Sequence, residues 1–520
     1  MKFLFWKCIT ALFFLFVVQL QARAQNTGIF EGATDVGPVK HKGASAHAKA
    51  TGDYVLTGSG ANIWGGKDEF HFLWRKLKGD FILQTRAKFL GKGVDPHRKL
   101  GWMIRRSMES NAASVNATVH GDGLTSLQYR KEAGSDIKEE KFDLKAPDMI
   151  QLERRGNRFI MSVAPYGELY TVKEVADVDL GDEVYVGLYI CSHNADVVEK
   201  AQFDNVHITV PARESLVPYR EYIGSNIELF DLATGKRKII YIEPTSLQAP
   251  NWTLNGKSLL YNKSGLIYKL DLKTKKVSQV NTGDVQNNNN DHVISFDGKM
   301  LGLSSTSPDK KYSSVVYTVP ITGGTPKQIT PIGLSYLHGW SPDGAWLTFT
   351  GQRAGDFDIY KIPSKGGDEV RLTTAPGLDD GPEYSPDGKY IYFNSTRSGR
   401  MQLWRMKDDG SEQTQITNDT LNNWFPHISP DNKWIVFLSF GNDVKPDDHP
   451  FYKHVYIRAM PVSGGEPKVL VYLYGGQGTI NTPSWSPDSK RFAFVSNSAL
   501  LLEGGQKSTD GVTDKSKNRR

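Results

Sequence analysis

The pattern of apolar and polar residues first defines a β-rich region between residues 26 and 212. Apolar and polar positions alternate there in short segments, among them 70–74, 80–89, 149–153 and 184–190. This alternation is typical of strands with one buried face. Glycine-containing turns such as Lys78–Asp80 separate the segments, and no helical period of useful length appears. The pattern predicts a β-sandwich over residues 25–212, followed by a linker over 213–219.

A repeat begins near residue 220 and continues to about residue 498. Each unit has an extended segment, a turn of the Ser-Pro-Asp-Gly type, two strands and a turn of small residues. The aspartate position of this turn recurs at Asn255, Asp297, Asp343, Asp387, Asp431 and Asp488. The intervals are 42, 46, 44, 44 and 57 residues. These values fit the roughly 40–45 residues of a four-stranded propeller blade. An insertion over 441–452 explains the long interval.

The two ends of the repeat region complement each other. Residues 226–241 supply two strands without an inner partner, and the last repeat stops after Ser496 with only its inner strands. Joining these halves completes a sixth blade and removes free sheet edges. The prediction is an all-β protein with a β-sandwich followed by a six-bladed β-propeller over 220–502. The polar tail over 503–520 is predicted to be disordered.

Composition supports two folded domains and adds a targeting segment. The chain has 520 residues, of which 39% are hydrophobic and 23% charged, which excludes a disordered chain. An apolar run over 8–20, preceded by lysines and followed by Ala22-Arg23-Ala24, predicts a signal peptide over 1–24, cleaved near Ala24. We therefore expect a periplasmic or secreted bacterial protein without a membrane span. Cys191 is then the single mature cysteine, so no internal disulfide is expected.

The net charge does not indicate a nucleic-acid partner. The formal charge is +6. Lys2, Lys7 and Arg23 belong to the predicted signal peptide, and the tail contributes another +2. About +1 remains on the folded body, which provides no basic face for nucleic acid.

Three repeat segments resemble a known family. Residues 341–344, 380–395 and 486–490 are similar to the repeats of TolB-like propellers, also described as WD40-like or PD40 repeats. The N-terminal region resembles a concanavalin-like jelly-roll sandwich of the laminin-G or DUF1349 type. That fold is often attached to carbohydrate-active proteins, so the resemblance implies glycan binding.

Blade topology indicates where a ligand site would form. The segment leading into each inner strand and the loop leaving the second strand lie at the same end of the channel, where six similar loops form a mouth. Five residues before the turn position, four blades carry proline, whereas two adjacent blades carry His292 and His338. Both histidines are candidate ligands of a divalent metal such as Mn, Zn or Ca. Gln477 or an aspartate would supply an oxygen ligand. The alternative is that both histidines form hydrogen bonds in the channel lining or bind a ligand without metal.

This candidate metal set is similar to the site of oligogalacturonate lyases, propeller enzymes in which several histidines and a glutamine bind a metal. The resemblance implies metal-assisted cleavage of a uronate-containing glycan.

Other polar residues near the mouth have two interpretations each. Arg353 and Arg397 occupy equivalent positions on adjacent blades and can form a fork for carboxylate or sulfate, or pair with Asp356 and Asp379 or their neighbours. Asp379 and Asp380 are candidates for general acid and base, or they cap the turn before Gly381.

Aromatic side chains and sandwich loops supply further candidates. Trp424 is either a platform for stacking a sugar or part of the packing between blades, and Tyr336 and His427 lie at neighbouring mouth positions. In the sandwich, two polar loops carry four candidates for ligand or calcium binding: His97, Arg98, His120 and Asp122. The alternative is that these residues only stabilise the turns in which they lie. Trp64 is either a core anchor or a sugar platform.

Two functional hypotheses follow. The first is recognition, with or without cleavage, of an anionic or plant-type glycan at the propeller mouth; the cleaving enzyme would be a carbohydrate-active lyase or hydrolase. The second is a non-catalytic envelope scaffold that binds a protein or peptide partner there.

Overall fold

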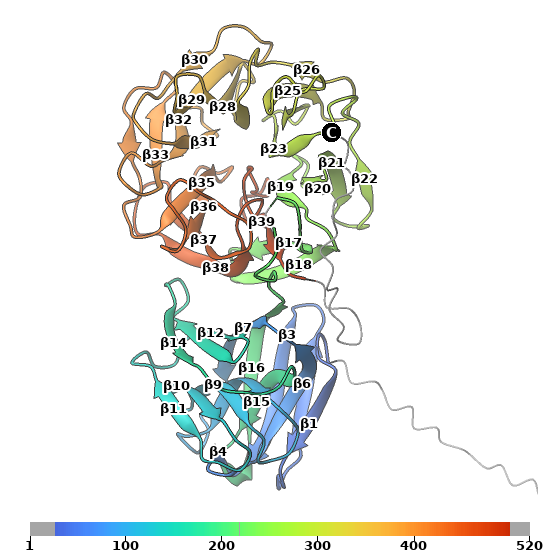
Figure 1. Cartoon of the computed structure of the whole chain (residues 1–520), viewed down its shortest axis with the longest axis vertical. Helices are drawn as coiled ribbons and strands as arrows, with labels where there is room; N and C mark the ends of the chain where they lie inside the picture. The colour runs from blue at the N-terminus through green and yellow to red at the C-terminus, as the bar shows by residue number, and fades with distance from the viewer. Residues whose placement is uncertain (1–26, 218, 500–520) are drawn as a thin grey trace, which may run out of the picture.

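The computed structural model describes residues 27–217 and 219–499. Within these ranges the secondary structure consists of β-strands and contains no α-helix. Figure 1 shows two bodies, a sandwich formed by the first half of the chain and a propeller ring formed by the second. The predicted signal peptide and the whole predicted tail lie outside the described residues.

Two seven-stranded antiparallel sheets form the N-terminal body. The first sheet has the order β1 (Gly32–Val36), β6 (Phe70–Lys78), β15 (Glu183–Cys191), β8 (Lys99–Arg105), β9 (Ser114–His120), β10 (Thr125–Arg130) and β11 (Lys138–Lys141). The second has the order β14 (Thr171–Val175), β13 (Arg158–Ala164), β12 (Met149–Arg155), β7 (Phe81–Phe89), β16 (Asn194–Thr209), β3 (Asp53–Gly60) and β2 (Ala44–Ala48).

A single apolar core joins the two sheets. Trp102 and Leu188 of the first sheet belong to the same buried cluster as Leu83 and Leu152 of the second. Because side chains alternate along a strand, this packing buries every second residue between the sheets. The all-β class predicted from the sequence is confirmed, whereas the jelly-roll, concanavalin-like assignment of this body stays a prediction.

A short hairpin of β4 (Ile63–Trp64) and β5 (Lys67–Asp68) covers part of the other face of the first sheet. Ile63 packs with Phe72, Met103 and Tyr189 in a small apolar cluster on that face. The neighbouring positions of β8, β9 and β10 on the same face are polar and buried.

Six sheets form the propeller, as the repeat predicts. Five blades have four strands in sequence order: β19 (Gln248–Trp252), β20 (Ser258–Lys263), β21 (Leu266–Asp271) and β22 (Val277–Gln279); β23 (Asn288–Ile294), β24 (Met300–Ser305), β25 (Val315–Pro320) and β26 (Lys327–Gln328); β27 (Ser335–Trp340), β28 (Trp346–Gln352), β29 (Phe357–Pro363) and β30 (Val370–Arg371); β31 (Asp379–Tyr384), β32 (Tyr390–Ser395), β33 (Gln402–Lys407) and β34 (Thr414–Gln415); β35 (Asn422–Ile428), β36 (Trp434–Phe440), β37 (Lys453–Pro461) and β38 (Lys468–Gly475).

The sixth blade is assembled from both ends of the repeat region, which confirms the predicted closure. β17 (Ser225–Asp231) pairs with β18 (Lys236–Glu243) on one side and with β39 (Arg491–Asn497) on the other. The innermost segment of this blade forms only one bridge, between Trp485 and Phe492. The closure satisfies strand edges that would otherwise remain open.

In each of the first five blades, the inner strand bulges near the position where the repeat carries proline or histidine. Pairing shifts register between Gln248 and Asn251, across Pro250, and again between Leu337 and Gly339, across His338. The same irregularity occurs in the other three inner strands. Proline has no N–H to contribute to a ladder and is tolerated at a bulge. The proline and histidine positions therefore lie within the inner strands.

The sandwich contacts the rim of the propeller at blades five and six, beside β18 and β38, so it does not cover a mouth of the channel (Figure 1). The buried carboxylate of Glu228 binds Arg237 through two hydrogen bonds of 2.6 and 2.8 Å. His207, at the end of the sandwich strand β16, lies 3.3 Å from the same carboxylate. Burial opposes ionisation of Glu228, but Arg237 and His207 outweigh it and hold the pKa well below its usual range.

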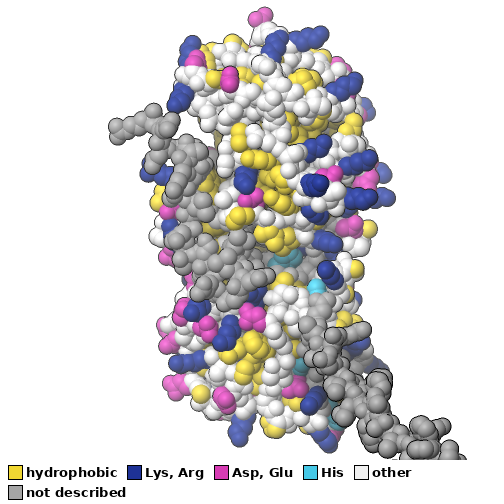
Figure 2. All heavy atoms as spheres, turned by 90° about the vertical axis from the view of Figure 1, so that its right-hand side faces the viewer, with side chains coloured by type: hydrophobic (Ala, Val, Ile, Leu, Met, Phe, Trp, Pro, Cys, Tyr) yellow, Lys and Arg dark blue, Asp and Glu magenta, His cyan; other side chains and the backbone are white. Residues whose placement is uncertain are grey.

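The surface shows mixed charge. In Figure 2, Lys and Arg side chains are interspersed with Asp and Glu over the face that is turned to the viewer. Within the described ranges, no helix is long and apolar enough to cross a membrane.

Glu228→Gln is expected to destabilise the protein by about 3–5 kcal/mol at pH 7, because it leaves the buried Arg237 without its carboxylate. Urea unfolding of the full chain measures this loss. Glu174→Gln is the control, since Glu174 and Arg158 form an exposed ion pair worth about 0–1 kcal/mol. Equal losses for the two variants would contradict this account of the interface.

Candidate functional site

A pocket of about 670 Å³ opens at the mouth of the propeller. Its seventeen lining residues carry mostly amide, hydroxyl and aromatic side chains: Tyr219, Tyr222, Thr245, Ser246, Gln248, Asn262, Ser264, Gly265, Asn287, Asn288, Asn289, Asn290, Thr306, Lys310, Ser313, Phe451 and Gln477. Thirteen of them come from segments leading into the inner strands and from loops leaving the second strands of blades one and two. Tyr219 and Tyr222 precede β17, Phe451 lies in the insertion after β36, and Gln477 leads into the sixth blade. The convergence predicted from blade topology therefore occurs at this end of the channel.

The amide side of the pocket is formed by the segment before and within β23. Asn288 is 5% exposed, and its Nδ2 donates to the carbonyl of Gly265 at 2.8 Å. Asn262 in turn donates from Nδ2 to the carbonyl of Asn288 at 3.0 Å. These bonds fix the backbone of two adjacent blades against each other at the mouth.

Two buried amide atoms in this wall have no hydrogen-bond partner. They are Oδ1 of Asn288 and Nδ2 of Asn290, and both residues line the pocket. Buried polar atoms are usually paired, because leaving one unpaired costs about 1–3 kcal/mol. One unpaired acceptor and one unpaired donor therefore remain for a bound ligand.

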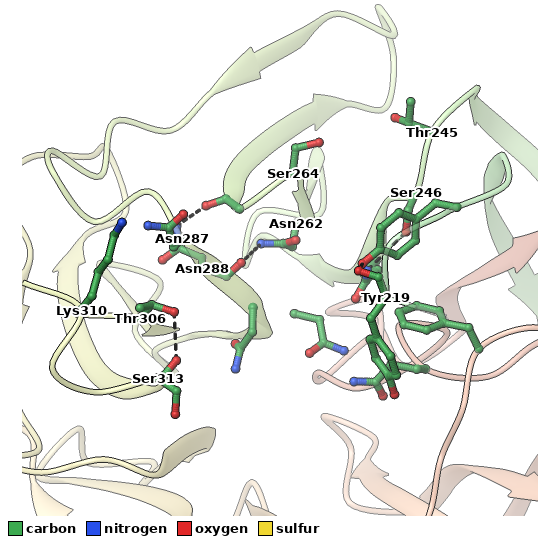
Figure 3. A pocket seen from close by; sticks show the side chains of 17 residues that line it. Tyr219, Thr245, Ser246, Asn262, Ser264, Asn287, Asn288, Thr306, Lys310 and Ser313 are labelled. Carbon is green, nitrogen blue, oxygen red and sulfur yellow. Dashed lines mark hydrogen bonds between the residues drawn. The ribbon is translucent and has the colours of Figure 1, made fainter. Parts of the chain in front are cut away.

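An aromatic wall faces the amides. In Figure 3, Tyr219 and Ser246 lie on one side of the pocket, and Asn287, Thr306 and Lys310 lie on the other. Phe451 belongs to the insertion in blade five, and its ring centroid lies 5.4 Å from that of Tyr219 and 5.8 Å from that of Tyr222. The insertion and the interdomain segment together form this wall.

Hydrogen bonds hold the insertion against the segments next to it. The carbonyl of Pro450 accepts a hydrogen bond from the N–H of Gln477 at 3.1 Å. The hydroxyl of Tyr452 accepts one from the N–H of Ile223 at 3.1 Å. Gln477 lines the pocket, and its Oε1 accepts from Nδ2 of Asn481 at 3.0 Å.

A cluster of ionisable side chains lies deeper in the ring. His338 Nε2 is 3.3 Å from Asp380 Oδ1, which also accepts hydrogen bonds from Thr350 and the N–H of Gly381. Burial opposes the charge of Asp380, but the hydrogen bond and charge of His338 hold its pKa below the usual value. Burial similarly disfavours charged His338, while Asp380 and Asp291 outweigh burial and raise its pKa. Burial and the charge of Asp380 raise the pKa of Asp291 to about 6, against the attraction of His338.

His292 is fully buried and lies apart from this cluster. Its Nδ1 is 3.1 Å from the carbonyl of Asn290, and burial lowers its pKa to about 4. Among the residues that the structure describes, no group of three or more His, Cys, Asp or Glu side chains is arranged to hold a metal ion. A metal on His292, His338 and Gln477 therefore stays a prediction from sequence.

Both candidate arginines are bound within their own blades. Arg353 forms hydrogen bonds of 2.7 and 2.9 Å with the carboxylate of Glu369, and not with Asp356. Arg397 pairs with Asp379 at 2.6 Å. Burial raises the pKa of Asp379, and Arg397 partly offsets this. The pairing of Arg397 with Asp379 matches one of the two interpretations from sequence. The residues of both ion pairs, Arg353 with Glu369 and Arg397 with Asp379, do not line the pocket.

The other candidates near the mouth also have structural partners. Trp424 is 0% exposed and packs against Phe425 and His449 with ring centroids 5.6 and 4.4 Å away, so its ring is part of the core. His427 contacts Glu383 through Nδ1 at 2.5 Å and the carbonyl of Ile480 through Nε2 at 2.6 Å.

Tyr336 is partly buried beside the ring of Phe357, with centroids 6.2 Å apart. Burial and the nearby charges of Asp291 and Asp380 raise its pKa.

In the sandwich, the polar loops show mainly turn chemistry. Asp122 accepts a hydrogen bond from the N–H of Leu124 at 3.0 Å, as expected of a turn aspartate. Arg98 is buried and pairs with Glu199 at 2.6 Å. His97 and His120 lie with ring centroids 5.8 Å apart. Trp64 is 44% exposed, which excludes a role as core anchor.

Sequence reasoning identified only Gln477 among the residues that line the pocket. The signal that would have found the amide wall is the run of four asparagines over 287–290, directly before Asp291 and His292. The aromatic wall has no comparable signal, because Tyr219 and Phe451 are distant in sequence and meet only when the ring closes.

Comparison with known proteins supports the propeller. Residues 332–447 match the family profile of the TolB β-propeller domain. A curated relative from Agrobacterium fabrum strain C58, named uncharacterized protein Atu1656, is 45% identical over 272 residues, which cover 52% of this chain and 92% of the relative.

One solved structure supports the same conclusion. A protein from Agrobacterium tumefaciens that is proposed to be a TolB is 44% identical, and the alignment covers 53% of this chain and 99% of that protein with a TM-score of 0.51. TolB from Acinetobacter baumannii aligns over 63% of this chain and 79% of its own, with 16% identity and a TM-score of 0.40.

Asp291→Asn is expected to stabilise the protein at pH 8 by about 3 kcal/mol and to have little effect at pH 4. The folded state raises the pKa of Asp291 from 3.8 to about 6. Above pH 6 the ionised carboxylate therefore lowers the free energy of unfolding. This penalty vanishes at low pH, where the carboxyl group is protonated in both the folded and the unfolded state. Urea unfolding at the two pH values measures the difference.

Asp297→Asn, in the exposed turn of the same blade, is the control with the opposite sign. Hydrogen bonds from Ser295 and the N–H of Lys299 lower the pKa of Asp297, so its ionised form supports folding at pH 8. A gain for Asp291→Asn that is equal at both pH values would contradict the assignment.

Proposed function

Because this chain belongs to the TolB-like β-propeller family, with its repeats closed into six blades, we propose that it is an exported binding protein that recognises a glycan at the propeller mouth. The observation that carries the proposal is the pair of unpartnered amide atoms on Asn288 and Asn290 in a pocket faced by aromatic rings. Lys310 is the single charged side chain among the seventeen lining residues, so the pocket favours a largely neutral ligand.

The chemistry of the two walls fits a saccharide. A hydroxyl both donates and accepts hydrogen bonds, and a side-chain amide offers one donor group and one acceptor group to neighbouring hydroxyls. Tyr219, Tyr222 and Phe451 provide apolar ring surface for the C–H face of a pyranose. The volume of about 670 Å³ is in the range typical of small-ligand pockets.

Recognition, and not cleavage, is the proposed activity. Asp379 and Asp380, the residues expected from sequence to act as acid and base, engage Arg397 and Thr350 and do not line the pocket. The pocket itself presents amides and hydroxyls, which bind and orient a ligand.

A second candidate function is a scaffold that binds a peptide segment of a partner at the same mouth. Membership of the TolB-like family, together with the 44% identity to the Agrobacterium tumefaciens protein, favours this alternative. An extended peptide also offers alternating donors and acceptors to the amide wall.

The glycan proposal predicts that the double variant Asn288→Ala/Asn290→Ala binds at least tenfold more weakly than the wild type, because two buried hydrogen bonds to the ligand are lost. Isothermal titration calorimetry with cellohexaose, xylohexaose and mannohexaose measures the affinity. Asn255→Ala is the control, since Asn255 lies in the turn at the opposite end of blade one. Failure of all three oligosaccharides to bind the wild type rejects a neutral glycan of these types.

The peptide alternative predicts a different result. A photo-cross-linking amino acid at position 222 should capture a peptide from envelope extracts, and the capture should disappear in the Asn288→Ala/Asn290→Ala background. The same probe at Phe296, an exposed residue in the turn after β23, should capture nothing. Capture that is equal at both positions would reject specific peptide binding at the mouth.

A further inference from the structure

The first sandwich sheet has a buried polar face that lies away from the propeller pocket. Strands β8, β9 and β10 point every second side chain away from the core. These residues form rows across the sheet because Met103 pairs with Asn116 and Asn116 pairs with Gln128. Lys99 pairs with His120 in the same register. Polar side chains therefore fill a face that is nevertheless closed to solvent.

Five buried polar atoms on this face have no hydrogen-bond partner. They are both amide atoms of Asn116, Oε1 of Gln128, Nδ1 of His120 and Oγ of Ser114. Asn116, Gln128 and Ser114 are 0% exposed. Leaving this many polar atoms unpaired is unfavourable in a folded protein, and it points to groups that a bound molecule would satisfy.

The unpaired atoms include both donors and acceptors. Nε2 of Gln128 donates to Nε2 of His120 at 3.2 Å and to Oγ of Ser126 at 3.1 Å, so Oε1 of Gln128 remains an acceptor. Because Nε2 of His120 accepts, its Nδ1 carries the proton and is a donor. Burial and the charge of Lys99 lower the pKa of His120 to about 3, which keeps the ring neutral.

The same face holds more positive than negative charge. Arg105 and Arg130 are fully buried and share one carboxylate, Asp68, at 3.6 and 2.7 Å. Lys99 is 2% exposed, and in the described part of the chain no carboxylate lies within 4 Å of its Nζ. Glu139, at the sheet edge, is paired with Lys141. A buried charge without a counter-charge is costly, so the face favours an anion.

Lys99 is held in place by neutral partners. Its Nζ donates to Oδ1 of Asn62 at 2.9 Å and to the carbonyl of His97 at 3.2 Å. Nδ1 of His193 lies 3.2 Å away. Burial lowers the pKa of Lys99, which the more distant Asp95 and Glu139 only partly oppose.

The covering hairpin is fastened by these same cations. The carbonyl of Gly65 accepts a hydrogen bond from Arg130 at 2.6 Å, and Asn62 and Asp68 bind Lys99 and Arg130. Ile63 contributes to the apolar cluster next to the polar rows. A ligand on this face would lie between the polar rows and an apolar surface that contains Met103 and Tyr189.

We infer that the polar face of β8, β9 and β10 is a second ligand site, which binds an anionic, hydroxyl-rich molecule of the uronic acid type beneath the β4–β5 hairpin. The mixed donors and acceptors suit hydroxyl groups, and the uncompensated cations suit a carboxylate. The adjacent apolar surface suits the C–H face of a sugar ring. This inference does not depend on the function proposed for the propeller mouth.

Calorimetric titration of the full mature chain with sodium D-glucuronate and sodium D-galacturonate tests the site. We expect saturable binding of at least one uronate and at least tenfold weaker binding of D-glucose, which lacks the carboxylate. Asn116→Asp keeps the shape of the side chain and adds a negative charge, so it should weaken uronate binding more than tenfold. The Asn288→Ala/Asn290→Ala variant of the mouth should bind the uronate as the wild type does.

A second measurement separates a ligand site from a structural one. Asn116→Leu replaces an amide whose two polar atoms are both unpaired by an apolar group of similar size, so it should abolish uronate binding without lowering Tm in the absence of ligand. Absence of binding by both uronates, binding that survives Asn116→Asp, or a clear loss of Tm in the leucine variant would each overturn the inference. The last result would indicate that buried water pairs the amides in the native fold.

Discussion

The pairing of β17 with β39 is the interaction on which the rest of the propeller depends. Seven residue pairs, from Ser225 with Asn497 to Asp231 with Arg491, join strands that are separated by most of the repeat region. Without this ladder, β18 and β17 would present an open sheet edge and the ring would have a gap between blades five and one. Because a ring constrains all its members together, one closure fixes the position of all six blades.

The closure also determines where the sandwich attaches. β18 becomes the outermost strand of the sixth blade. Its residue Arg237 and Glu228 of the adjacent β17 provide the buried ionic contact with His207 of the sandwich. A second contact lies beside it, where Tyr472 and Val469 of β38 pack with Met149 and Ala164. The sandwich therefore occupies the rim, and the mouth remains available for a ligand.

Most of the ionisable side chains that look catalytic in sequence stabilise this architecture. The Arg353–Glu369 and Arg397–Asp379 pairs lie within single blades, and His427 connects blade four to the segment leading into blade six through Glu383 and Ile480. Among the buried polar atoms that lack a partner in the described residues are amide atoms of Asn288 and Asn290 in the mouth and of Asn116 and Gln128 in the sandwich.

The sequence by itself determined the elements and their number. Alternating polarity predicted strands at 80–89 and 149–153, and the recurring turn predicted six blades, because both features depend on local geometry with a fixed period. The complementary half-blades even predicted the closure, since an unpaired strand edge is unfavourable anywhere. Only the tertiary structure decided which polar side chains line the pocket at the mouth. His338 gained a partner from the neighbouring blade, Trp424 gained one from the insertion of its own blade, and Tyr219 and Phe451 became one wall. Those contacts join residues whose distance in sequence carries no period.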